Sequence, residues 1–138
     1  MIIKFNSFKI FLPKKRKKQE YFKVMIFSSR KSMYKVRKAL EDDGANNMGK
    51  MNFAAICTAY ESKADPQQFG VLMFTKNSAR KSGIVSHELA HAISFYWPHR
   101  EKDNWGKILG EGKVNERFAW ITGDFVSQYW QQWYTIKK

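Results

Sequence analysis

Residues 68–96 read QFGVLMFTKNSARKSGIVSHELAHAISFY, and the succession of elements is clearest in this segment. Its opening residues, 68–75, are mostly apolar with β-branched and aromatic members, which predicts a strand. Asn77 or Ser78 is then expected to cap a helix that runs to about Tyr96, and Pro98 stops it. The segment therefore predicts a strand and a long helix joined by a short loop.

The rest of the chain extends this pattern to a small α+β domain. The residue patterns predict an edge strand or packed arm over residues 1–12, strands over 20–28 and 51–61, and helices over 29–40 and about 113–134. Strand 51–61 is expected to form a hairpin with 68–75, and residues 98–112 are expected to form a loop. We therefore expect an α+β fold, in which a small mixed sheet packs on helix 77–96 and on the C-terminal helix.

Length and composition indicate one domain. The chain has 138 residues, of which 43% are hydrophobic, so it has enough apolar surface to fold and long disorder is excluded. We describe it as a single domain with a basic part, residues 1–50, and a core that carries the candidate metal ligands, residues 51–138. The single cysteine excludes a disulfide framework and a cysteine-based zinc site.

The candidate chemistry lies in the motif His87-Glu88-Leu89-Ala90-His91. Helix positions four apart lie on one face, so His87 and His91 can bind one zinc ion through their ring nitrogens. Glu88 would lie beside the metal and act as general base on a water that zinc acidifies. The pattern therefore predicts a zinc site with Zn²⁺ as the cofactor and Glu88 as the catalytic residue.

A catalytic zinc needs a third protein ligand, and a carboxylate of the last helix is expected to supply it. Glu116 is the preferred residue, because Ala119 and Gly123 would let this helix approach the histidine helix closely. Glu111 is a rival ligand. Asp124 is another, and it also suits a hydrogen bond to a ligand histidine. His99 follows the helix end at Pro98 and reads as a surface histidine.

The combination of His87-Glu88-Leu89-Ala90-His91 with Asn115-Glu116-Arg117-Phe118-Ala119 resembles zincin metallopeptidases of the gluzincin type. It is most similar to compact zincin-like proteins of phages and mobile elements and to the metallopeptidase domain of ImmA/IrrE regulators. The resemblance covers about residues 68–130. It implies Glu116 as the third zinc ligand, and it implies that strand 68–75 binds peptide by edge pairing.

The chain departs from the larger gluzincins in two ways. Trp120 stands where those enzymes carry an aspartate four residues after the third ligand, and no histidine follows the last helix to stabilise the oxyanion. The residues left for that role are Arg117, Tyr129, Tyr134 and His99. Ser94 and Trp97 replace the glycine and histidine of the metzincin motif, which excludes that class.

The net charge of +13 is concentrated in residues 1–50, which carry a net +10. The run that stands out is Lys14, Lys15, Arg16, Lys17 and Lys18, which could contact nucleic acid or another polyanion. A solvated basic face that keeps the chain in solution is the simpler interpretation. No apolar run is long enough for a membrane span, and the first residues lack the order of a secretory signal, so we expect a cytoplasmic protein.

Two functions follow from these patterns. The first is a zinc-dependent metallopeptidase that hydrolyses a peptide or protein substrate. The second is a non-catalytic zincin scaffold that acts in binding or assembly, as a phage or nucleic-acid-associated protein with a basic N-terminal face. The metallopeptidase is the preferred interpretation, and the missing oxyanion donor and the basic face support the scaffold as the alternative.

Overall fold

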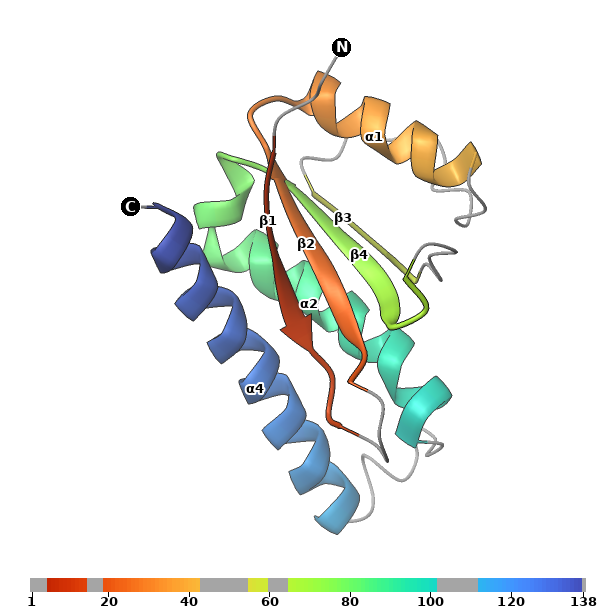
Figure 1. The fold of residues 1–138 in the computed structure, drawn as a ribbon. Coiled ribbons are helices and arrows are strands. Elements are labelled where there is room, and N and C mark those ends of the chain that lie inside the picture. The colour runs from red at the N-terminus through yellow and green to blue at the C-terminus, as the bar shows by residue number, and fades with distance from the viewer. Residues whose placement is uncertain (1–4, 15–18, 43–54, 60–64, 102–111, 138) are drawn as a thin grey trace.

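The structure is a computed structural model that describes residues 5–14, 19–42, 55–59, 65–101 and 112–137 (Figure 1). The described elements run in the order β1 (Phe5–Phe11), β2 (Tyr21–Phe27), α1 (Arg30–Asp42), β3 (Ala55–Ala59), β4 (Gln68–Thr75), a 3₁₀ turn (Ser78–Arg80), α2 (Ser82–Tyr96), a π-helical turn (Trp97–Glu101) and α4 (Gly112–Lys137). This order of strands and helices agrees with the prediction, and the α+β class is confirmed. No helix in these ranges is long and apolar enough to cross a membrane.

The four described strands form one mixed sheet in the order β1-β2-β4-β3. β1 pairs antiparallel with β2, β2 pairs parallel with β4, and β3 pairs antiparallel with β4, as expected for the predicted hairpin. β4 therefore has a neighbour on each side. The expectation that Gln68–Thr75 offers a free edge to a peptide is wrong, because β2 and β3 already occupy both of its edges; within the described sheet the outer strands are β1 and β3.

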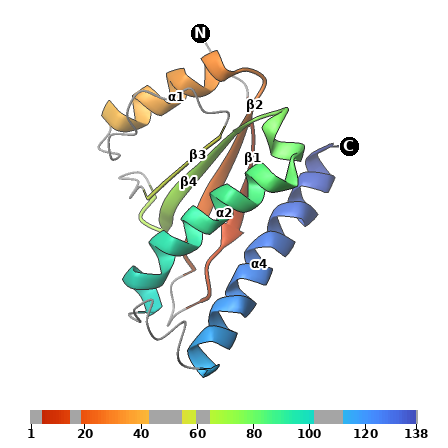
Figure 2. The same cartoon turned by 180° about the vertical axis from the view of Figure 1, so that it is seen from behind.

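Helices cover both faces of the sheet. α2 and α4 lie on one face, which Figure 2 shows, and α1 lies across one end of the other face, which Figure 1 shows. The alternation of side chains along β2 serves both layers: Phe22, Val24 and Ile26 join the core with α2 and α4, while Met25 and Phe27 pack with α1. Every residue of β4 is buried, as is typical of a strand covered on both faces.

The helix that carries the histidines begins later than expected. Asn77 and Ser78 do not cap it: Ser78 starts the 3₁₀ turn, and α2 begins at Ser82 with no side-chain cap. The backbone N–H and the hydroxyl of Ser78 are instead engaged with Thr75 at the end of β4. α2 ends at Tyr96, as predicted, but the chain continues through the π-helical turn up to Glu101 where a loop was expected.

α4 is anchored to the sheet layer by apolar side chains and by two polar contacts. Ile121, Phe125 and Tyr129, spaced four residues apart, are buried against the core. The Tyr129 hydroxyl donates to the Ala79 carbonyl at 2.6 Å. Gln128 binds the outer edge of β1, accepting from the Phe11 N–H at 2.7 Å and donating to the Phe11 carbonyl at 2.9 Å. One side-chain amide thus satisfies both peptide groups of this edge residue.

Replacing Gln128 by Ala is expected to lower the free energy of unfolding by about 1–3 kcal/mol, because two hydrogen bonds to Phe11 are lost. Urea denaturation measures this change. Gln131→Ala is the matched control, since Gln131 is exposed on the same helix and its described side-chain bond, to Ser127, is long at 3.4 Å. Equal effects of the two substitutions would show that the Gln128 contact does not hold β1 to α4.

Candidate metal centre

The orientation of α2 is set by its apolar residues. Val85, Leu89, Ala92 and Ile93 are buried against the sheet and α4. Both histidines of the motif lie between these positions and are exposed, whereas Glu88 is buried. The side chain of His87 is 68% exposed. The packing of α2 therefore turns the histidine pair away from the core.

The two motif histidines converge as the spacing predicts. The Nε2 atoms of His87 and His91 lie 3.1 Å apart, and their rings meet edge to face with centroids 4.8 Å apart. Two nitrogens bound tetrahedrally to one zinc at about 2.0–2.1 Å would lie roughly 3.3–3.4 Å apart. The two imidazoles are therefore arranged closely enough to share one metal ion with a small adjustment.

The protonation of His91 also suits metal binding. Partial burial lowers the pKa of His91, and the neighbouring His87 lowers it further. Both effects favour the neutral imidazole, and a histidine must be neutral to coordinate a metal. The site is therefore biased toward its ligating form.

Glu88 occupies a different environment from the histidines beside it. Its side chain is buried and lies at the flank of α2, with Oε1 4.0 Å from Nε2 of His87. Burial raises the pKa of Glu88, and the charge of His87 offsets part of that rise. Burial also raises the pKa of the Cys57 thiol on β3, and the charge of Glu88 adds to it. The carboxylate thus interacts electrostatically with both His87 and Cys57 of the outer strand β3.

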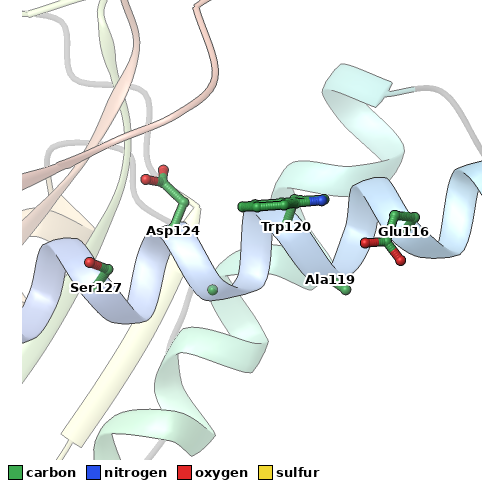
Figure 3. A pocket seen from close by; sticks show the side chains of 6 residues that line it. Glu116, Ala119, Trp120, Asp124 and Ser127 are labelled. Carbon is green, nitrogen blue, oxygen red and sulfur yellow. The ribbon is translucent and has the colours of Figure 1, made fainter.

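The carboxylates of α4 lie in a separate hollow. This hollow, of about 480 Å³, is lined by Glu116, Ala119, Trp120, Gly123, Asp124 and Ser127, all on one exposed face of the helix. Figure 3 shows the Trp120 indole lying between the Glu116 and Asp124 carboxylates. Neither motif histidine lines the hollow. The structure therefore brings His87, Glu88 and His91 together but leaves Glu116 in another group.

The small residues of α4 do not have the role expected from the sequence. Ala119 and Gly123 are exposed, and a Cβ added at Gly123 would meet nothing within 4 Å. α4 instead packs through Ile121 and Phe125, which are buried. The expected close approach of the two helices through Ala119 and Gly123 is wrong, because these residues lie on the face opposite the packed one.

Asp124 has a partner other than a histidine. Its Oδ2 accepts a hydrogen bond from Gln128 at 2.8 Å, so the carboxylate supports the amide that binds β1. Glu111, the other rival for the third ligand, lies outside the described residues. Among the described residues, no group of three or more His, Cys, Asp or Glu side chains is placed to hold a metal. The third ligand stays a prediction.

A polar cluster that the sequence did not reveal lies at the C-terminal end of α2. Arg117 of α4 forms an ion pair with Glu101, whose side chain is only 4% exposed, and the Tyr96 hydroxyl donates to Glu101 at 3.0 Å. Arg117 lies 16 residues after Glu101 on another helix, so no local pattern signals the cluster. Arg117, considered above as an oxyanion donor, is therefore engaged in joining α4 to the end of α2.

The three other candidates for the oxyanion role also have structural contacts. The Tyr129 hydroxyl is buried and bound to a backbone carbonyl, as described above. His99 is exposed in the π-helical turn, with Nδ1 2.7 Å from the Phe95 carbonyl, which agrees with its interpretation as a surface histidine. Tyr134 is 57% exposed and packs against Trp130 and Trp133. None of these contacts directs a donor toward the histidine pair.

The basic run is described only at its first residue. Lys14 is exposed just after β1. Its continuation, Lys15, Arg16, Lys17 and Lys18, lies outside the described residues. The predicted contact of this run with a polyanion therefore stays a prediction.

Comparisons with protein-family models, with curated proteins and with solved structures found no match to this chain. The functional interpretation below therefore depends on the geometry of the residues themselves.

In metal-free protein, the buried Glu88 carboxylate is expected to make stability depend on pH. Its pKa is raised above the ordinary value of 4.5 in the folded chain, so the folded state keeps the proton to higher pH than the unfolded state. The free energy of unfolding should fall as pH increases from 4.5 through the raised pKa. Glu88→Gln should lack this fall and be more stable than the parent above that interval.

Denaturant unfolding at a series of pH values, with chelator present, measures the effect. Glu116→Gln is the control, because it makes the same carboxylate-to-amide change at an exposed residue. A Glu88→Gln profile parallel to that of the parent chain would show that Glu88 is not desolvated in solution.

Proposed function

We propose that the chain is a zinc-dependent metallopeptidase with a zincin-like fold. The observation that carries the proposal is the convergence of the His87 and His91 Nε2 atoms at 3.1 Å on the exposed face of α2, with Glu88 beside them. Zinc, when bound, supplies a Lewis acid that polarises a carbonyl and lowers the pKa of water to about 7. His87 and His91 would hold it through their neutral rings.

Glu116 is the proposed third ligand. Its carboxylate is exposed on the first turns of α4, where its side chain is available for a ligand role. Binding through Glu116 requires this carboxylate to approach the imidazoles when the metal enters. Glu111 and Asp124 remain the rivals, and Asp124 would first have to leave Gln128.

Glu88 is the proposed general base. A raised pKa brings a carboxylate closer to neutral pH, where proton transfer in both directions is efficient. Glu88 would accept a proton from the attacking water and then donate it to the nitrogen of the departing amine. Its burial beside His87 fixes the carboxylate at the edge of the histidine pair, so that the reacting water would lie between them.

The peptide substrate would bind along β3 instead of β4. β3 is an outer strand of the described sheet and lies next to α2, with Cys57 near Glu88. An extended peptide paired with the outer edge of such a strand gains main-chain hydrogen bonds and passes beside the adjacent helix. This arrangement would present a peptide carbonyl to the histidine face.

A specific observation also favours the second function, a non-catalytic zincin scaffold. Arg117 is paired with Glu101 and the Tyr129 hydroxyl is bound to Ala79, so two of the residues considered for oxyanion stabilisation have other roles. A scaffold of this kind could still bind zinc through the histidine pair. A measurement of zinc binding therefore tests the metal centre, and a measurement of peptide turnover is needed to distinguish the peptidase from the scaffold.

Zinc binding is expected to require both histidines. His91→Ala should reduce zinc affinity by more than the roughly 10–100-fold that is typical of losing an outer-sphere partner, because a direct ligand is removed. Equilibrium dialysis with metal analysis measures this, and His99→Ala is the matched control, since His99 is an exposed histidine outside the pair. Unchanged zinc binding in His91→Ala would disprove the metal centre.

Peptide hydrolysis is expected to require Glu88, whereas zinc binding is expected not to require it. Glu88→Gln should retain zinc and lose turnover of a mixed peptide library, by about 100-fold or more, since general base catalysis contributes on that order. Glu116→Gln should instead lose zinc together with activity. Hydrolysis that survives in Glu88→Gln would contradict the mechanism. A parent chain that binds zinc without hydrolysing any peptide would favour the scaffold function.

A further inference from the structure

A row of lysine and aromatic side chains lies on the sheet face opposite α2. These residues are Phe5, Lys9 and Phe11 of β1 and Tyr21 and Lys23 of β2, and we call them the lysine–aromatic face. The neighbouring residues in β1, Phe8 and Ile10, point to the opposite side and are buried in the core with α2 and α4. Figure 1 looks onto this face: α1 crosses one end, and no described helix covers the remaining length of β1 and β2.

The two lysines of this face are direct neighbours across the strands. Lys9 and Lys23 are register partners in the β1–β2 pair. Like charges placed directly opposite each other destabilise a sheet, so this pairing works against folding. Local conflicts of this kind are expected at functional sites, where a charge arrangement is retained for binding.

Aromatic rings hold both ammonium groups in place. Lys9 Nζ lies 4.4 Å from the centre of the Tyr21 ring, and Lys23 Nζ lies 5.6 Å from the centre of the Phe5 ring. These cation–π contacts orient the charges without neutralising them. The face therefore presents fixed positive charges interleaved with aromatic surface.

Exposed phenylalanines mark the two ends of the row. Phe5 is 37% exposed and Phe11 is 42% exposed, although both are large apolar side chains. They are separated by six positions on β1, which corresponds to about 20 Å along a strand. The two lysines lie between them, so a bound molecule could contact both rings and both charges at once.

Further positive charge continues from this row onto α1. Lys31, Lys35 and Lys38 are exposed on one side of that helix, and Lys14 is exposed beyond the Phe11 end. An acidic group also lies at the row: Asp65 accepts a hydrogen bond from the Tyr21 hydroxyl. This bond lowers the pKa of Asp65, the Gln67 N–H lowers it further, and so do Lys9 and Lys23. Six lysines thus lie along the row or extend from its ends.

We propose that the lysine–aromatic face binds single-stranded nucleic acid. Phosphates would contact Lys9 and Lys23, and unpaired bases would stack on the exposed rings of Phe5 and Phe11. A span of about 20 Å accommodates a few nucleotides of a single strand. The fit is to an unpaired strand, because duplex bases are stacked on each other and cannot lie on the two rings. This site uses none of the residues of the metal centre and does not depend on the proposed peptidase activity.

The charge part of the proposal is tested with a double variant. Lys9→Gln/Lys23→Gln should weaken binding of a fluorescent twelve-nucleotide oligothymidylate at least about tenfold at low salt. The slope of log affinity against log salt should fall by about 1.4, since two phosphate contacts are lost. Fluorescence anisotropy at several salt concentrations gives both quantities. Lys81→Gln/Lys113→Gln is the matched control, because it removes the same charge from exposed residues at the starts of α2 and α4.

The stacking part is tested separately. Phe11→Ala should weaken binding about fivefold or more, as expected for the loss of one stacked base. Trp120→Ala is the matched control, since Trp120 is an aromatic residue that is 73% exposed on α4 and is not part of the lysine–aromatic face. Thermal unfolding of each variant shows whether the fold is intact. Removing the opposed lysines relieves their repulsion but loses two cation–π contacts, so thermal unfolding must show that the double variant is folded before its binding is compared.

Three results would overturn the proposal. Equal weakening by the two double-lysine variants would show that binding follows net charge and not this face. Tighter binding to a duplex of the same length than to the single strand would exclude base stacking as the basis of recognition. Binding to vesicles of anionic lipid, with no binding to the oligonucleotide at low salt, would assign the charge to a membrane surface.

Discussion

The burial of β4 on both of its faces is the constraint from which the rest of the arrangement follows. Every residue of Gln68–Thr75 is buried, and β2 and β3 flank the strand. Such a strand needs a helical layer on each face, and α1 provides one while α2 and α4 provide the other. The apolar stripe of α2 is then fixed against the sheet, and helical periodicity turns His87 and His91 outward.

Periodic patterns explain what the sequence could reveal. The order of strands and helices, the β3–β4 hairpin and the shared face of the histidines all depend on local spacing of two, or of three to four, residues. The same rule could have identified β4 as a central strand, because its apolar run does not alternate. The apolar run of β4 thus indicated a central strand, whereas the expectation of a free edge came from the resemblance to zincin metallopeptidases.

Contacts between distant residues lie beyond such patterns. The pairing of Gln128 with Phe11, and that of Arg117 with Glu101, depend on the angle at which α4 crosses the other elements. The same angle decides whether Glu116 faces the histidines, and the composition of α4 did not predict it. Ala119 and Gly123 are small, but Ile121 and Phe125 determine which side of the helix is packed. In this helix the larger apolar residues prevail because they gain more from burial.

The position of Glu88 follows from the same geometry that exposes the histidines. Successive helix residues are about 100° apart, so a helix that exposes His87 and His91 places residue 88 at its flank. On this helix the flank meets β3, where burial raises the pKa of the carboxylate. The lysine–aromatic face, in contrast, lies on β1 and β2, across the sheet from α2. The fold therefore separates a candidate reactive group from a candidate binding face by a full sheet layer, so that a change in either one need not disturb the other.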